Sequence, residues 1–175
     1  GLELGGKNGI IVMKDADIDN AVNGIVWSAF GTTGQRCTAC SRVLVHASVR
    51  KKLEQKLLAK LKTTRIGNGM QSTTSIGPLI NKRAVEKVKA YVEIGKQEGA
   101  HVLCGGKPLA RQGFFYAPTI FTNVTKTMRI AREEIFGPVL SILTFSTFEQ
   151  AIDIMNIVDY GLSGAIYTKD IGNAM

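Results

Sequence analysis

The sequence contains no long hydrophobic run. No apolar stretch approaches the roughly 20 residues that a membrane-spanning helix needs, and the first residues lack the charged-then-apolar layout of a signal peptide. Internal repeats and low-complexity linkers are absent as well. We therefore expect a globular chain with no membrane partner.

Cysteine is scarce. The 175 residues include three cysteines and two histidines. A small, odd number of cysteines in a chain of this length argues against the disulfide framework of small secreted domains and favours a reducing compartment. The sequence therefore predicts a cytoplasmic protein.

The remaining composition is ordinary, with 45% hydrophobic and 21% charged residues in a length that suits one domain with a sizeable core. A net charge of +8 could indicate an anionic partner. Much of this charge lies in residues 49–65, where leucines share one face of an expected helix and the lysines lie mostly off it. No aromatic residues lie among these lysines to stack on bases. We predict a solvated surface helix and no nucleic-acid partner.

Short apolar runs alternate with segments of helical periodicity along the chain. Such alternation predicts an α/β fold, a three-layer sandwich with a largely parallel sheet and helices on both faces. The expected strands are 8–13, 41–47, 101–106, 114–124, 138–146 and 164–168, and the expected helices are 15–30, 49–65, 81–98 and 147–158, with Gly99 ending the third helix.

Two cysteines, Cys37 and Cys40, lie three residues apart in the stretch FGTTGQRCTACSR. A zinc site would need two further ligands at suitable spacing, whereas Cys104, His46 and His101 are scattered singly. We therefore predict no metal site. A thioredoxin-type pair opens a helix directly after a strand. Here a polar loop precedes the pair and an apolar strand follows it, so a redox pair is disfavoured but stays open.

The third interpretation makes Cys37 a lone nucleophile. The loop is rich in main-chain N–H groups and places Arg36 beside the thiol, and both features stabilise a thiolate that attacks an electrophilic carbon. From this stretch alone an inert thiol remains the alternative.

Three short motifs follow one another along the chain: LELGGK at 2–7, GQRC at 34–37 and EEIFGPV at 133–139. Glu3 and Cys37 are separated by 34 positions, and Cys37 and Glu134 by 97. In this order and spacing the motifs resemble those of the NAD(P)-dependent aldehyde dehydrogenase superfamily. Supporting segments extend the resemblance over almost the whole chain.

The resemblance implies that Cys37 is the nucleophile. Its thiolate would add to an aldehyde, giving a thiohemiacetal whose hydride passes to the nicotinamide and leaves a thioester. The main-chain N–H of Cys37 would form one half of the oxyanion hole. Glu3 would be the general base that activates water for thioester hydrolysis. Family members that transfer the acyl group to coenzyme A usually lack this glutamate, so the resemblance favours a free carboxylate product.

The resemblance also implies residues that bind NAD or NADP. Glu134 would accept hydrogen bonds from the nicotinamide ribose hydroxyls, and Phe136 would contact the nicotinamide ring. Leu4 and Gly5 would lie at the cofactor, and glycine at 5 and 6 would allow close approach of the main chain to the cofactor or nucleophile. Lys87 matches a lysine that in some members lies near the ribose.

By the same resemblance, residues 1–175 are the catalytic domain, truncated at both ends. The dinucleotide-binding domain and an asparagine that supplies the second oxyanion donor would precede it, so we expect this chain alone to be inactive and not to bind NAD tightly. The parent protein would be a homodimer or homotetramer that acts on a small aldehyde.

The pattern around Arg36 looks more like members that act on semialdehydes, such as α-ketoglutarate semialdehyde or aminoadipate semialdehyde. Two other functions stay open, namely a thiol-redox module using Cys37 and Cys40, and a non-catalytic structural relative.

Overall fold

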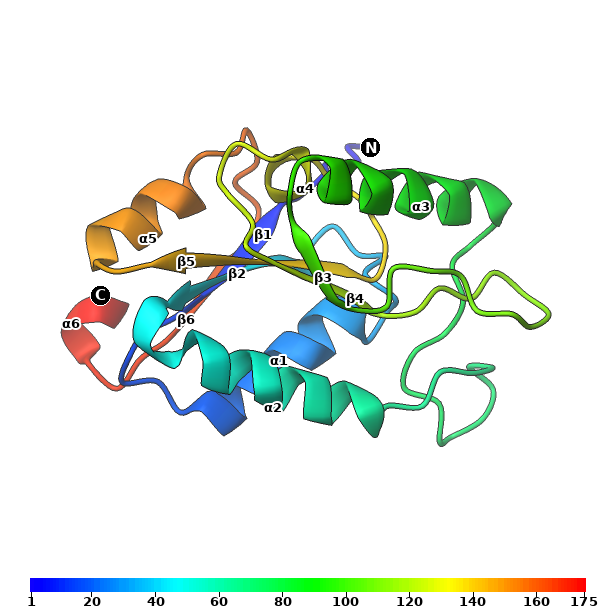
Figure 1. Cartoon of the computed structure of the whole chain (residues 1–175), viewed down its shortest axis with the longest axis horizontal. Coiled ribbons are helices and arrows are strands. Elements are labelled where there is room, and N and C mark those ends of the chain that lie inside the picture. Colours follow the sequence, from blue (N-terminus) through cyan, green and yellow to red (C-terminus); the bar gives the residue numbers. More distant parts are fainter.

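The computed structural model describes all 175 residues and contains one six-stranded sheet with helices on both faces (Figure 1). The strand order is β3-β4-β5-β2-β1-β6. The strands are β1 (Asn8–Val12), β2 (Cys40–His46), β3 (His101–Cys104), β4 (Thr119–Thr122), β5 (Val139–Phe145) and β6 (Gly164–Tyr167). The helices are α1 (Ile18–Phe30), α2 (Arg50–Lys62), α3 (Lys82–Gln97), α4 (Arg129–Arg132), α5 (Phe148–Met155) and α6 (Ile171–Ala174), and a 3-10 turn (Ala47–Val49) precedes α2.

Strand pairing confirms the predicted fold class. Every neighbouring pair is parallel except β3 with β4, which is antiparallel. The inner strands β1, β2 and β5 are buried almost throughout, because helices cover both faces of the sheet and shield these strands from solvent. The edge strands β3 and β6 are more exposed.

The core divides at the sheet. In β1, Ile10 and Val12 pack with α1 and α2, whereas Ile11 packs on the opposite face near α5. Successive strand residues point to opposite faces, so a continuous apolar run supplies both cores at once. In Figure 1, α1 and α2 lie below the sheet, and α3, α4 and α5 lie above it.

Local signals account for the helix ends. Asp17 caps α1 by accepting from two main-chain N–H groups, and Asn81 caps α3 by accepting from the Ala84 N–H. Gly99, at φ +95°, follows α3 in a conformation that suits glycine, as predicted. In α2, Leu53 and Leu57 are buried while most of the lysines face solvent. None of the helices is both long and apolar enough to span a membrane.

One predicted strand was too long, and one short helix was missed. Residues 114–118 do not join the strand expected there: apart from an isolated bridge between Tyr116 and Pro108, pairing begins at Thr119, since Pro118 has no N–H to donate to a ladder. The short helix α4 was not predicted, because its four residues have no side-chain cap and are too few to show a helical period.

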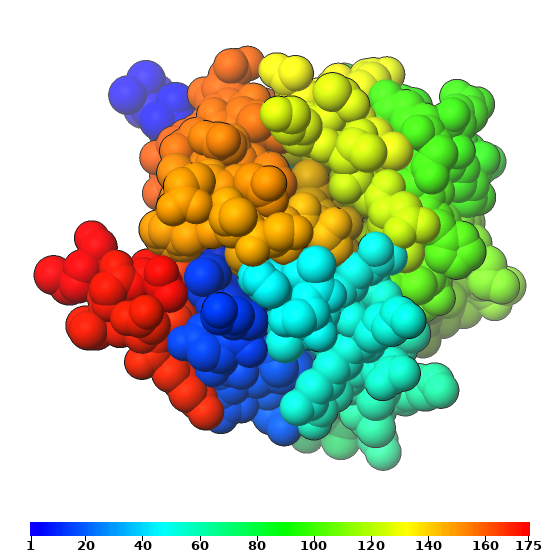
Figure 2. All heavy atoms as spheres, turned by 60° about the vertical axis from the view of Figure 1, so that its left-hand side comes forward, coloured from blue at the N-terminus to red at the C-terminus, as the bar shows by residue number.

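Both termini lie at the surface. Figure 2 shows the first residues (blue) projecting beside the segment that follows α5 (orange), and the C-terminal residues (red) standing out at the left edge. The first motif therefore runs from an exposed start into the buried strand β1.

A buried arginine joins β2 to two other segments. Arg42 is 1% exposed. Its Nε donates to the Lys7 carbonyl at 3.0 Å, and its two terminal nitrogens donate to the carbonyls of Ile154 and Met155 at 2.9 and 3.0 Å. Burial lowers the pKa of Arg42 to about 10, which leaves the side chain charged at neutral pH. The end of α5 and the entry to β1 are thus held by one side chain.

Replacement of this arginine by an apolar side chain of similar length tests how much it contributes to the free energy of unfolding. Arg42→Met leaves one buried and two partly buried carbonyls without their donors. Because a buried unsatisfied carbonyl costs about 1 to 3 kcal/mol, we expect the free energy of unfolding to fall by about 2 kcal/mol or more. Urea titration measures this. Arg83→Met, at an exposed position of α3, is the control and should change the value by less than about 0.5 kcal/mol. Equal free energies of unfolding in the two variants would contradict the stabilising role assigned to Arg42.

Candidate active site

One open cleft, with a volume of about 470 Å³, brings the three motifs together. The first motif contributes the main chain that enters β1, the second the loop between α1 and β2, and the third the segment before β5. Six of the seven site residues named from the sequence line it: Glu3, Leu4, Gly5, Cys37, Glu134 and Phe136. Gln35, Arg36 and Thr38 complete the lining.

The loop that carries Cys37 is shaped by two residues in left-handed conformation. Thr33 has φ 59° and Gly34 φ +66°. A side chain at Gly34 would place its Cβ 2.0 Å from the Gly137 carbonyl oxygen, so the second and third motifs touch main chain to main chain. The Thr33 hydroxyl donates to the Gly77 carbonyl at 3.0 Å and fixes the loop from its other side.

The two cysteines of this loop differ in environment. The Cys37 thiol is exposed on the cleft, whereas Cys40 is 3% exposed at the start of β2. The Cys40 thiol donates to the Arg42 carbonyl at 3.3 Å, and burial raises its pKa to about 12. Cys40 is therefore held as a neutral thiol, and only Cys37 is accessible for chemistry.

The close approach predicted for the glycines of the first motif is present. A Cβ on Gly6 would lie 2.2 Å from the Cys37 carbonyl oxygen, and one on Gly5 would lie 3.0 Å from Glu134 Oε2. Because these two glycines have no side chains, the main chain of the first motif can pass between the other two motifs. The Gly6 N–H donates to Glu134 Oε1 at 2.9 Å, which ties the first motif to the third.

The two adjacent glutamates of the third motif have separate surroundings. Glu133 accepts two hydrogen bonds from Arg129, at 2.7 and 2.9 Å, and one from the Tyr91 hydroxyl at 2.7 Å. These bonds, those of Arg129 foremost, lower the pKa of Glu133 to about 2. Glu134 lines the cleft, where Oε2 accepts no hydrogen bond from the chain.

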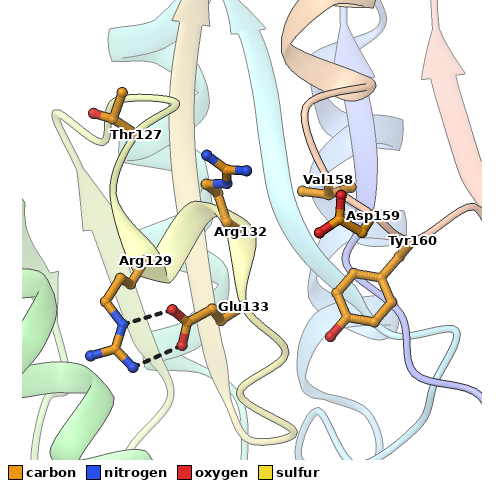
Figure 3. A pocket seen from close by; sticks show the side chains of 7 residues that line it. All are labelled: Thr127, Arg129, Arg132, Glu133, Val158, Asp159 and Tyr160. Carbon is orange, nitrogen blue, oxygen red and sulfur yellow. Dashed lines mark hydrogen bonds and ion pairs between the residues drawn. The ribbon is translucent and has the colours of Figure 1, made fainter.

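A second cleft, of about 550 Å³, lies beyond Glu133 (Figure 3). Figure 3 shows Arg129 and Glu133 facing each other across one side of it, with Arg132, Asp159 and Tyr160 around the opening. None of its lining residues was named from the sequence as a site residue.

Phe136 and Lys87 differ in where the structure places them. Phe136 is 42% exposed on the cleft and has φ 59°, a conformation that a bulky residue adopts only where its surroundings impose it. Lys87 is exposed on α3, where its ammonium lies 6.0 Å from the centre of the Tyr91 ring. It does not line the cleft, so its cofactor role stays a prediction.

Two residues directly after the first motif's glycines were not named from the sequence as site residues. Asn8 donates to the carbonyls of Cys37 and Ala39 at 2.6 and 3.0 Å, and its neighbour Lys7 is buried. A polar pair at the head of a wholly apolar strand was the available signal. No three His, Cys, Asp or Glu side chains gather closely enough to hold a metal ion.

The sequence matches the aldehyde dehydrogenase family over residues 1–175.

The chain belongs to the aldehyde dehydrogenase family.

Two curated relatives illustrate the range of the family. The chain is 45% identical over 177 residues to a betaine aldehyde dehydrogenase of Mesorhizobium japonicum, covering 99% of the chain and 36% of the relative. It is 42% identical over 178 residues to an alpha-ketoglutaric semialdehyde dehydrogenase of Bacillus subtilis, with the same coverage. The chain thus spans about a third of the length of these aldehyde dehydrogenases.

Solved structures confirm the fold. A NAD-dependent aldehyde dehydrogenase from Sinorhizobium meliloti superposes with a TM-score of 0.97 at 42% identity, covering 99% of this chain and 35% of that one. A betaine aldehyde dehydrogenase from Staphylococcus aureus, solved in complex with NAD+, gives 0.96 at 42% identity, with 99% and 35% covered. The α/β sandwich predicted from the sequence is therefore the aldehyde dehydrogenase fold.

This aldehyde dehydrogenase chain buries the ionisable side chain of Lys7. The side chain is 1% exposed, and its Nζ has no hydrogen-bond partner. Burial, reinforced by the nearby Arg42 charge and opposed by Glu134, lowers the pKa of Lys7 from its ordinary 10.5 to about 7. Between these values the unfolded chain binds more protons than the folded one, so stability rises with pH.

Lys7→Met should reduce this pH dependence. For the wild type we expect the urea midpoint to rise from pH 7 to pH 9, while in Lys7→Met the rise should be smaller, since no group there changes from charged to neutral on folding. Above pH 9 the raised pKa of Cys40 acts in the opposite direction and limits the range. Lys51→Met, at an exposed position, should keep the wild-type slope, and an unchanged slope in Lys7→Met would contradict the assignment.

Proposed function

We propose that this chain is the catalytic region of an NAD(P)-dependent aldehyde dehydrogenase that oxidises an aldehyde to its carboxylate through a thioester on Cys37. The observation that carries the proposal is the single cleft in which Cys37, Glu3 and Glu134 meet from three distant motifs. The chain spans about a third of the length of its relatives, and we propose that further domains complete the cofactor and substrate sites. The activity is therefore assigned to the full-length protein.

Cys37 is suited to the first step. Its thiol is exposed on the cleft, and the main-chain N–H groups of Cys37 and Thr38 donate to no acceptor in the chain. Free N–H groups beside the thiol stabilise a thiolate and then the oxyanion that forms when it adds to the aldehyde carbonyl. The product of this addition is a thiohemiacetal on Cys37.

Glu3 is proposed as the general base of the hydrolytic step. Its carboxylate is exposed on the wall of the cleft that holds Cys37 and has no hydrogen-bond partner in the chain. A free carboxylate facing a thioester can take a proton from water and direct the resulting hydroxide to the acyl carbon. Hydrolysis then releases the carboxylate product and restores the thiol.

The cleft also fits a nicotinamide cofactor. Glu134 has one oxygen held by the Gly6 N–H and the other free to accept from ribose hydroxyls. Phe136 offers an exposed aromatic side chain on the same wall. When bound, NAD(P)+ would supply the hydride acceptor. The NAD+ complex of the Staphylococcus aureus relative supports this choice, and NADP remains the alternative cofactor.

The thiol-redox alternative has little support. A dithiol pair needs two thiols that both reach an oxidant or a partner. Cys40 is buried, bonded to the Arg42 carbonyl and shifted towards the neutral thiol. A non-catalytic relative would have no need to keep an exposed thiol, a free glutamate and a held glutamate in one cleft.

Substitutions in the full-length protein test the mechanism. Cys37→Ser should lower kcat for NAD(P)-dependent aldehyde oxidation by about 10³-fold or more, because the nucleophile is lost. Glu3→Gln should give one acyl-enzyme per site and then stall, which stopped-flow absorbance at 340 nm resolves as a burst. Cys40→Ser is the matched control and should stay active. Turnover that survives Cys37→Ser, or equal losses at both cysteines, would contradict the proposal.

We further propose a semialdehyde that carries a carboxylate as the substrate. Arg36 lines the cleft, and its guanidinium lies 4.7 Å from the centre of the Trp27 ring and donates to the Thr32 hydroxyl at 3.1 Å. It pairs with no carboxylate of the chain. A cation here attracts an anionic aldehyde and disfavours a cationic one such as betaine aldehyde, which supports the likeness to the semialdehyde dehydrogenase.

Removal of the Arg36 charge tests substrate class. Arg36→Gln should lower kcat/KM for α-ketoglutarate semialdehyde by about tenfold or more, since a hydrogen bond to a charged group contributes about 1.5 to 3 kcal/mol. The value for propanal should change by less than about twofold. Arg83→Gln on α3 controls for net charge. An equal loss with both aldehydes would contradict a role in carboxylate recognition.

A further inference from the structure

Asn8 lies beneath the Cys37 loop and contacts it through its side chain. The residue is 5% exposed. Its Nδ2 donates to the carbonyls of Cys37 and Ala39 at 2.6 and 3.0 Å, and its Oδ1 accepts from the Ser163 N–H at 3.0 Å. Because Ser163 offers a donor and the other two offer acceptors, only one orientation of the amide satisfies all three.

An irregularity in the sheet directs this side chain. Asn8 pairs with Cys40, but the next residue, Gly9, pairs with Arg42, so Ser41 has no partner on β1. Such a bulge re-aims the side chains around it and is common beside active sites. The Ser41 hydroxyl donates to the Asn8 carbonyl at 3.2 Å and closes the bulge.

The amide of Asn8 sets the direction of the peptide group after Cys37. The chain contains no cis peptide bond. In a trans peptide the carbonyl and the following N–H point in opposite directions. When Asn8 holds the Cys37 carbonyl on the protein side, the Thr38 N–H points the other way. This N–H donates to nothing in the chain, and Thr38 lines the cleft.

We propose that Asn8 is a positioning residue for the nucleophile: by holding the carbonyls of Cys37 and Ala39, it fixes the Cys37–Thr38 peptide with its N–H directed away from the protein interior. This inference rests on the proposed function for the identity of the nucleophile. The fixed N–H is a preorganised donor for the Cys37 thiolate and for the oxyanion formed on the aldehyde carbon.

The other bonds of the loop act at its flanks. Thr33 bonds to Gly77, Gln35 bonds to Pro78 and Ile80, and the Cys40 N–H donates to the Ser28 hydroxyl at 3.1 Å. None of them reaches the Cys37 carbonyl. Gly6 passes close to that carbonyl but offers it no donor, since its own N–H goes to Glu134. Asn8 alone among the side chains holds the nucleophile's own peptide group.

The test compares Asn8→Ala with Ser141→Ala in the full-length protein. Ser141 is fully buried in β5 and donates to the Ile130 carbonyl at 3.1 Å, so its loss also removes a buried side-chain bond to a carbonyl, outside the residues that line the cleft. The first readout is the rate of Cys37 alkylation by iodoacetamide at neutral pH, followed by peptide mass spectrometry. Cys40 is buried and Cys104 half-buried, so the exposed thiol reports first.

We expect Asn8→Ala to slow alkylation of Cys37 at neutral pH by about tenfold, because a loosened peptide no longer presents its N–H to the reacting sulfur. kcat should fall by a similar factor, with KM for NAD changed less than about twofold. Ser141→Ala should alkylate at the wild-type rate even where its stability falls.

Wild-type alkylation in folded Asn8→Ala would overturn the inference, and so would equal slowing in both variants. If Asn8→Ala does not fold, Asn8→Asp replaces it: this residue keeps the shape and the bond from Ser163, loses both donors and should show the same slowing. Alkylation needs no turnover, so its outcome is separate from that of Cys37→Ser. Activity without Cys37 would end the proposed function and leave the alkylation result to decide whether Asn8 positions the thiol.

Discussion

The enclosed guanidinium of Arg42 joins three segments that are far apart in the sequence. It satisfies the Lys7 carbonyl at the entry to β1 and two carbonyls at the end of α5, and it projects from the middle of the sheet. A buried cation is tolerated only where its donors are used, and here each donor group finds a carbonyl. The unpartnered Lys7 beside it loses most of its tendency to ionise. The entry to β1 therefore combines one buried cation that the main chain solvates with one buried amine that has no hydrogen-bond partner.

The cleft itself is assembled largely from main chain. Gly6 lies against the Cys37 carbonyl, and Gly34 lies against Gly137, at distances that admit no side chain. Motifs more than a hundred residues apart thus meet through backbone atoms, and the side chains of Cys37 and Glu134 project from that frame into the opening. Such a frame places groups more accurately than mobile side chains do, which suits chemistry that tolerates little displacement.

The sequence was informative wherever the signal was local or belonged to a motif. Apolar runs predicted the inner strands, and the three motifs predicted six residues of the cleft. Other features depend on contacts across the fold. The φ of Phe136, the bulge at Asn8 and the burial of Lys7 and Arg42 arise from packing between segments that no window of the sequence joins. Lys87 was assigned by resemblance alone; it is exposed on α3 and does not line the cleft, and its cofactor role stays a prediction.

The anchoring of Glu133 links the helices α3 and α4 to cofactor binding more than to the chemistry of the Cys37 thiol. Arg129 from α4 and Tyr91 from α3 hold Glu133, and Glu134 follows directly along the main chain. Neither helix contributes a residue to the cleft. Loosening of these helices would therefore move the carboxylate proposed for the ribose before it moved Cys37, which is fastened from beneath. Cofactor affinity and thiol reactivity can therefore change independently as the sequence evolves, because the helices above the sheet support one and a strand of the sheet supports the other.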